Sequence, residues 1–239
     1  MIKRWFLVTG ASKGIGRAIS ERFAAEGHAV VGIARTPDPT FPGELVSIDL
    51  ADRDRAGNAI AELAQEYRFD GLINNFGTVR MHRVGEIKLS ELDDILETNI
   101  YPVVQATQAV LPGMKDRGLG RIINISSLTV IGIAGRSAYA AAKSALNSLT
   151  RTWAIELAEA GVTVNAVAPG PIETALFRKN TPTGSDAEKR FLGLIPMRRL
   201  GQPDEVAAAV SYLASDAAGY VTGQTLFVDG GGSIGRSPI

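Results

Sequence analysis

The sequence predicts an α/β protein: a doubly wound, parallel, seven-stranded sheet with helices on both faces. Short apolar runs alternate with longer segments of helical periodicity, and short links between them favour right-handed βαβ crossovers. The 239 residues, 45% of them hydrophobic, supply a sizeable core, and one domain of this length is common in this class. We therefore expect residues 1–239 to form a single domain.

The first unit is a strand, a glycine-rich turn and a helix. The apolar run 5–8 enters the turn. Ile15, Ile19 and Phe23 then recur at helical spacing, and Gly27 ends the helix. This order of elements predicts a parallel strand whose carboxyl end leads directly into a helix N-terminus.

The rest of the chain repeats the alternation. Runs rich in Val and Ile predict buried strands, and amphipathic runs predict helices. Ser90, followed by Asp93 three residues later, predicts a capping pair at a helix start. In chain order we expect strand 28–34, loop 35–43, strand 45–48, helix 52–67, strand 71–75, helix 90–118, strand 121–126, helix 137–160, strand 162–167 and strand 225–228.

Residues 171–201 interrupt this rhythm between the sixth and seventh strands. The segment is polar with scattered apolar residues, and long loops of this kind are usually functional lids or disordered. It begins at the carboxyl edge of the sheet, where ligands bind in such folds. We expect a substrate lid; the alternative is a fixed helical hairpin that serves only subunit packing.

Composition narrows the function. Lys and Arg (25) balance Asp and Glu (25), so we expect no nucleic-acid or membrane partner. The chain has no cysteine, and its two histidines, His28 and His82, are scattered, so no metal site is expected. No stretch offers the ~20 apolar residues of a membrane span, and the N-terminus does not resemble a signal peptide. We expect a cytoplasmic protein that acts on a small molecule.

The turn at residues 9–16, Thr-Gly-Ala-Ser-Lys-Gly-Ile-Gly, is the first candidate site. Glycine tolerates positive φ and lets a ligand approach the bare backbone. The free N–H groups and positive dipole end of the next helix favour a diphosphate. The spacing differs from the commoner Gly-x-Gly-x-x-Gly, so these residues alone allow either a nucleotide site or a plain turn.

Tyr139 and Lys143 form the second candidate site. Four residues apart on a helix, they lie side by side on one face. A phenol with a pKa of ~10 is a poor acid at neutral pH, but a neighbouring ammonium would lower that pKa and make Tyr139 a usable proton donor. Ser127, after Ser126 at a strand end, either holds a carbonyl oxygen or is a turn residue.

Taken in order, these motifs resemble those of the short-chain dehydrogenase/reductase family. The resemblance runs from residue 5 to Gly231, and the glycine turn combined with Tyr-x-x-x-Lys is highly specific. It implies a Rossmann-type fold that binds NAD(P) and a homotetramer built through the two long helices. The matching residues are Thr9 to Gly16, Asp49, Asn74-Asn75-Phe76-Gly77, Asn99, Ser127, Tyr139 to Lys143, Pro169, Gly170 and Thr174.

The resemblance also implies roles. Tyr139 would be the general acid in reduction and the base in oxidation, and Ser127 would orient the substrate oxygen. Lys143 would hold the nicotinamide ribose, and Asn99 a water that links Lys143 to solvent. Phe76 departs from the family's Asn-Asn-Ala-Gly and either fills core or changes the cofactor site. The implied cofactor set is Gly10, Ser12, Lys13, Gly14, Ile15, Gly16, Arg35, Asp49, Leu50, Asn75, Phe76, Gly77, Tyr139, Lys143, Pro169, Gly170, Ile172 and Thr174.

Arg35 and Lys13 favour NADP over NAD. Members that use NAD carry an acidic residue at the end of the second strand for the ribose 2′-hydroxyl. Arg35 occupies that position here, and Lys13 lies in the glycine turn, so two cations suit a 2′-phosphate. Asp38 lies three residues further along, behind Pro37, and is a poor substitute.

The sequence thus predicts an NADPH-dependent oxidoreductase that reduces a 3-oxoacyl thioester or small ketone to a secondary alcohol, with Tyr139 as proton donor. Arg117, near the end of one long helix, suits an acyl-carrier substrate, whereas Ala160 in the other helix does not. The alternatives are a polyol, sugar or secondary-alcohol dehydrogenase that works oxidatively, and a non-catalytic NADP-binding scaffold. The complete catalytic set argues against the scaffold.

Overall fold

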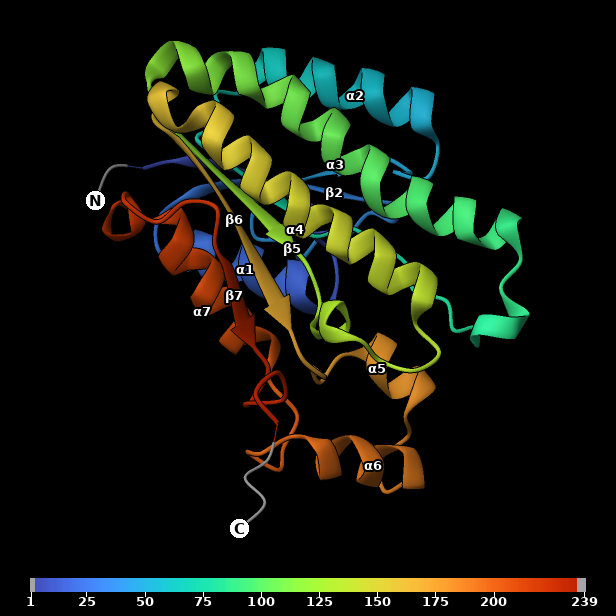
Figure 1. The fold of residues 1–239 in the computed structure, drawn as a ribbon. Coiled ribbons are helices and arrows are strands. Elements are labelled where there is room, and N and C mark those ends of the chain that lie inside the picture. Colours follow the sequence, from blue (N-terminus) through green and yellow to red (C-terminus); the bar gives the residue numbers. More distant parts are fainter. Residues whose placement is uncertain (1–2, 236–239) are drawn as a thin grey trace.

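The computed structural model describes residues 3–235, which form a seven-stranded parallel sheet of order β3-β2-β1-β4-β5-β6-β7 (Figure 1). Strand order reverses between β1 and β4, which creates the switch point where ligands bind in doubly wound sheets. The predicted fold class is confirmed. The strands are β1 (Trp5–Thr9), β2 (Ala29–Ala34), β3 (Glu44–Ser47), β4 (Gly71–Asn74), β5 (Gly120–Ile125), β6 (Val162–Pro169) and β7 (Thr225–Val228).

Helices cover both faces of the sheet because successive strand residues point to opposite sides. Phe6 and Val8 of β1 pack toward α1 (Gly14–Ala25) and α7 (Pro203–Ala214). Leu7, between them, packs into the opposite layer. That opposite layer is formed by α2 (Arg53–Glu66), α3 (Leu89–Arg117) and α4 (Ser137–Leu157), side by side in Figure 1.

In the described chain, no helix has both the length and the apolar character required to cross a bilayer.

Helix α7 was not among the expected elements, although its start carries clear signals. Pro203 occupies the first helical turn, and the backbone N–H of Gln202 donates to the Glu205 carboxylate at 2.7 Å. Val206 and Val210 follow at helical spacing and are buried. The segment was overlooked because it follows directly on the irregular residues 171–201.

One predicted cap is wrong, whereas the other predicted boundaries lie within a few residues of the observed ones. Helix α3 begins at Leu89, with Lys88 as its N-cap and no side-chain capping bond. Ser90 and Asp93 therefore lie inside the helix and do not cap it.

Residues 171–201 contain two helices, α5 (Ala175–Asn180) and α6 (Asp186–Leu194). They lie beyond the carboxyl ends of β5, β6 and β7, in the region to which the strand arrows point in Figure 1. Arg178 of α5 binds Glu173 before the helix and Glu188 of α6, with Nη1 of Arg178 2.5 Å from Glu188 Oε1. The segment is thus a compact helical pair above the ligand-binding edge.

Candidate active site

The glycine turn between β1 and α1 exposes backbone donors. Gly10 and Gly14 have φ of +66° and +55°, which favour glycine. A Cβ on Gly16 would lie 2.3 Å from the Gly10 carbonyl oxygen, so a side chain there would collide with the turn. Lys13 is the N-cap of α1 and makes no side-chain capping bond, so the first N–H groups of α1 stay available to a diphosphate.

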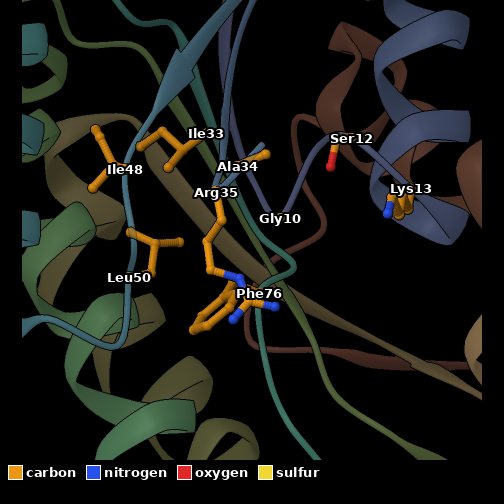
Figure 2. A pocket seen from close by; sticks show the side chains of 9 residues that line it. All are labelled: Gly10, Ser12, Lys13, Ile33, Ala34, Arg35, Ile48, Leu50 and Phe76. Atoms are coloured by element: carbon orange, nitrogen blue, oxygen red, sulfur yellow. The ribbon is translucent and has the colours of Figure 1, made fainter. Parts of the chain in front are cut away.

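A cavity of about 150 Å³ opens beside this turn, and Figure 2 shows its lining. Apolar side chains from the ends of β2 and the following strand form one wall, as an adenine ring would require. Arg35 and Lys13 both border the cavity, and Figure 2 shows them on opposite sides of Gly10. The lining comprises Gly10, Ser12, Lys13, Ile33, Ala34, Arg35, Ile48, Leu50 and Phe76.

No carboxylate among the described residues lines this cavity. Asp38, the acidic residue nearest the end of β2, instead accepts from Arg17 Nη1 at 2.7 Å and from the Thr40 backbone at 2.9 Å. Asp49 is exposed and accepts from the Ala51 N–H at 3.1 Å. The cavity therefore offers cations and no acceptor carboxylate, the electrostatics that suit a 2′-phosphate.

Two residues after β4 fix the turn and shape the cavity. The Asn75 side-chain amide donates to the carbonyls of Thr9 and Gly10 at 3.0 and 3.1 Å, which holds the glycine turn against β4. Phe76 both lines the cavity and packs against the apolar layer beneath α2 and α3. The two expectations for Phe76 are therefore compatible, since its ring packs against the core and also lines the cavity.

Lys143, Asn99 and Gly77 meet at the carboxyl end of β4. Lys143 is fully buried, donates from Nζ to the Ile125 carbonyl at 2.8 Å, and has its pKa lowered by burial to about 8. A Cβ on Gly77 would lie 2.5 Å from Asn99 Oδ1 and 3.2 Å from Lys143 Nζ. The absence of a side chain at Gly77 thus leaves room for the two polar groups.

The hydrogen bonds of the Asn99 side chain account for its position inside helix α3. Its amide donates to the Ile95 carbonyl one turn earlier at 2.9 Å and to the Thr78 carbonyl at 3.0 Å. Its Oδ1 is buried and has no hydrogen-bond partner among the described groups. Buried polar atoms are rarely left unpaired, so this oxygen is an acceptor site for a water or ligand beside Lys143.

The Ser127 hydroxyl and the Arg136 guanidinium both lie near the Tyr139 phenol. Burial raises its phenolic pKa, and those two groups oppose the rise. The expectation that Lys143 lowers this pKa is wrong for the protein alone: Nζ of Lys143 lies 5.7 Å from the ring centroid and bonds to the Ile125 carbonyl. Desolvation of the phenol therefore outweighs the Ser127 hydroxyl and the Arg136 guanidinium, and the Lys143 ammonium does not offset it.

The two serines at the end of β5 point to different places. Ser126 is buried, and its hydroxyl donates to the Lys143 carbonyl at 3.4 Å, inside the fold. Ser127 is only partly buried, and its Oγ accepts from the Thr129 N–H at 3.2 Å. Its hydroxyl also lies close enough to Tyr139 to lower the pKa of that phenol, so it is placed to donate to an oxygen that binds there. Of the two serines, only Ser127 faces the phenol.

The stretch after β6 closes the site over the glycine turn. The Gly170 N–H donates to the Val228 carbonyl at 2.9 Å and holds the end of β6, at Pro169, beside β7. Ile172 is buried and pairs with Gly201 in a short parallel bridge. Thr174 caps α5, and a Cβ on Gly14 would lie 3.3 Å from its methyl group. Ile15, at the other side of the turn, packs on the α1 layer.

A family model described as Enoyl-(Acyl carrier protein) reductase matches residues 10–233. The chain is 39% identical over 235 residues to the 3-oxoacyl-(acyl-carrier-protein) reductase FabG of Vibrio harveyi, which covers 94% of this chain and 95% of that protein. The chain belongs to the short-chain dehydrogenase/reductase family. It is an NAD(P)-dependent oxidoreductase.

Solved members of the family share the whole fold. A protein from Beutenbergia cavernae, assigned as a gluconate 5-dehydrogenase and solved with NADP at low occupancy, is 38% identical with a TM-score of 0.88, covering 95% of this chain and 96% of that one. Ligand-free aldohexose dehydrogenase of Thermoplasma acidophilum is 34% identical with a TM-score of 0.89, covering 99% and 96%.

Sequence reasoning missed the apolar wall of the cavity and Arg136. Ile33, Ala34 and Ile48 line the cavity from strand ends. The sequence pattern could have predicted this wall, because apolar residues at strand ends next to a switch point face the ligand that binds there. Arg136 belongs to no motif of the sequence, and although it stands three residues before Tyr139, its partial burial without a carboxylate partner in the described chain is seen only in the fold.

Proposed function

We propose that this short-chain dehydrogenase/reductase is an NADPH-dependent carbonyl reductase with Tyr139 as the proton donor. The observation that carries the proposal is that the Ser127 hydroxyl and the Lys143 ammonium both lie near the ring of this tyrosine. Asn99 completes the arrangement with its unpaired buried oxygen. A non-catalytic scaffold would have no use for this set of polar groups, each of which is costly to bury.

The residues divide the chemistry as follows. Bound NADPH would supply the hydride. The Ser127 hydroxyl would donate to the carbonyl oxygen, and the Tyr139 phenol would give that oxygen its proton as negative charge develops. A raised phenol pKa keeps Tyr139 protonated at neutral pH, as a proton donor must be. A water on Asn99 Oδ1 would resupply the proton past Lys143.

The cofactor preference rests on the cavity at the end of β2. Arg35 and Lys13 would bind the 2′-phosphate, with Gly10, Ser12, Gly14, Ile15 and Gly16 holding the diphosphate at the α1 N-terminus. Leu50, Asn75, Phe76 and Gly77 would border the adenosine and ribose, and Pro169, Gly170, Ile172 and Thr174 the nicotinamide. Asp49, exposed and outside the cavity lining, has the weakest structural support of the set.

We propose a 3-oxoacyl thioester or small ketone as the substrate. The FabG relatives support the thioester. Arg117, the residue expected to attract a carrier protein, instead donates to the Phe69 carbonyl at 2.5 Å and lies 3.7 Å from Asp70. That engagement favours the small ketone. The aldohexose dehydrogenase neighbour supports the second candidate, oxidation of a sugar or polyol.

We also propose that 171–201 is a substrate lid and that the enzyme is a homotetramer. The lid is supported by its place above the site and by the exposed Leu176, Leu194 and Met197, which would cover a ligand. Faster hydrogen exchange in the free protein than with NADPH and substrate would support it. The tetramer is supported by the exposed Ile155 on α4.

A substrate screen tests the reductase proposal. NADPH consumption would be followed with a 3-oxoacyl thioester, short ketones, oxo acids and oxidised sugars, and NADP⁺ reduction with the corresponding alcohols. We expect oxidation of NADPH by at least one carbonyl class. Binding of NADPH without turnover in either direction across the panel would favour the scaffold.

A further inference from the structure

Arg136 comes from the loop that leads from Ser127 into α4, three residues before Tyr139. It is the N-cap residue of α4, with φ of −121° and ψ of 18°, and its side chain makes no capping bond. A parallel bridge to His82 fixes its backbone, and the His82 N–H donates to the Gly135 carbonyl at 3.1 Å. The guanidinium therefore starts from a fixed point one helical turn from the phenol.

This guanidinium is partly buried yet has no counter-ion. Over residues 3–235, no carboxylate lies within ion-pair distance of it, and no side chain or carbonyl accepts a hydrogen bond from it. Glu91, on the neighbouring segment, is already engaged by His82 at 2.8 Å. Every other buried or partly buried arginine in this range is paired with a carboxylate: Arg4, Arg17, Arg117, Arg121 and Arg178.

The position is unfavourable for folding. Burial lowers the pKa of Arg136, because a guanidinium withdrawn from water without a partner loses solvation. Its place at the start of α4, a helix of 21 residues, adds repulsion from the positive end of the helix dipole. A bound anion would relieve both costs. The planar fork of arginine matches a carboxylate in two-point contact.

We propose that Arg136 determines substrate specificity by binding a carboxylate on the substrate itself, so that the enzyme acts on short-chain oxo acids and their hydroxy acids. The inference rests on the proposed function, since it requires the reacting carbonyl to sit at Ser127 and Tyr139. The Arg136 guanidinium at the N-cap of α4 is near enough to the Tyr139 phenol to lower its pKa, so a carboxylate bound to it lies within a few carbons of that carbonyl. A neutral ketone leaves Arg136 unpaired.

Calorimetric titration of the NADP⁺-saturated enzyme tests this without turnover. The ligands are short hydroxy acids, their methyl esters and hydroxyalkyl phosphates. Arg136→Gln removes the charge, Arg136→Lys keeps the charge without the fork, and Arg151→Gln removes an exposed charge elsewhere on α4. The wild type should bind the acid at least about tenfold more tightly than its ester, the scale of a charge-assisted hydrogen bond. Arg136→Gln should abolish that ratio, Arg136→Lys keep part of it, and Arg151→Gln leave it unchanged.

Equal binding of acid and ester by the wild type overturns the inference, even if Arg136→Gln fails to fold. An acid preference that survives in Arg136→Gln also overturns it, as does tighter binding of the phosphates, which would assign the site to a phosphorylated substrate. The reductase proposal has its own readout. An acid that binds through Arg136 but is neither oxidised nor formed by reduction would contradict the proposed function and leave the carboxylate site standing.

Discussion

The cofactor side and the substrate side of the site are built from different materials. Around the glycine turn the fold offers backbone N–H groups, missing side chains and exposed cations such as Arg35. Around Tyr139 it offers two buried polar side chains: Lys143, whose ammonium is desolvated, and Asn99, whose Oδ1 has no hydrogen-bond partner among the described groups. Added bulk or lost charge on the cofactor side should therefore change cofactor binding. Substitutions on the substrate side should change the rate of the chemical step.

The largest effect should come from Tyr139→Phe. Losing a positioned proton donor should lower turnover by at least ~10² while the fold remains. NADPH affinity, followed by nicotinamide fluorescence, should be nearly unchanged, because the phenol belongs to the chemical side. Ser126→Ala, next to Ser127 but directed into the fold, is the matched control for a lost hydroxyl. A Tyr139→Phe enzyme with most of its turnover would break the division between the two sides.

Arg35→Ala should act on binding alone. Loss of a charged contact to the 2′-phosphate should weaken NADPH about tenfold or more and leave NADH nearly unchanged. Arg55→Ala, which removes an exposed arginine of α2 outside the cavity, should change neither affinity. Wild-type enzyme that binds both cofactors equally would contradict the 2′-phosphate assignment.

Gly16→Ala should destabilise the cofactor side itself. The new methyl group would lie 2.3 Å from the Gly10 carbonyl oxygen and 2.5 Å from the Asn75 amide. Overpacking of this kind costs about 1–3 kcal/mol, which denaturant titration would measure as a lower free energy of unfolding. Gly85→Ala is the control, since nothing lies within 4 Å of the added methyl. Equal stability of the two variants would show that the glycine turn accommodates a methyl group at position 16.

A smaller effect should appear in the pH dependence of stability. Burial lowers the Lys143 pKa from 10.5 to about 8, so between these values the unfolded state binds more protons than the folded state. The free energy of unfolding should therefore rise with pH across that window, with a slope of at most about 1.4 kcal/mol per pH unit. Lys143→Met should flatten the rise. An identical slope in the variant would assign it to other groups.

Most of the fold could be predicted from the sequence, because the alternation of apolar runs and helical periodicity is regular from the N-terminus to β6. The sequence shows that Arg136 stands three residues before Tyr139, but not that its guanidinium is partly buried without a carboxylate partner among the described residues, because that depends on how the loop after Ser127 closes against His82. It also gave the wrong direction for the Tyr139 pKa, because spacing reveals a neighbouring ammonium but not desolvation. The glycine turn, in contrast, could be predicted from the sequence, because its role depends on the absence of side chains at its glycines, and the sequence shows that directly.

Hydride transfer from NADPH to a carbonyl carbon is the central claim, and isotope transfer tests it most directly. NADPH deuterated on the transferred position of the nicotinamide would be incubated with enzyme and the best carbonyl from the screen, and the alcohol analysed by mass spectrometry. The account predicts one deuterium on the carbinol carbon of the wild-type product, and little product from Tyr139→Phe. An unlabelled alcohol, or NADPH oxidation without any alcohol, would contradict it.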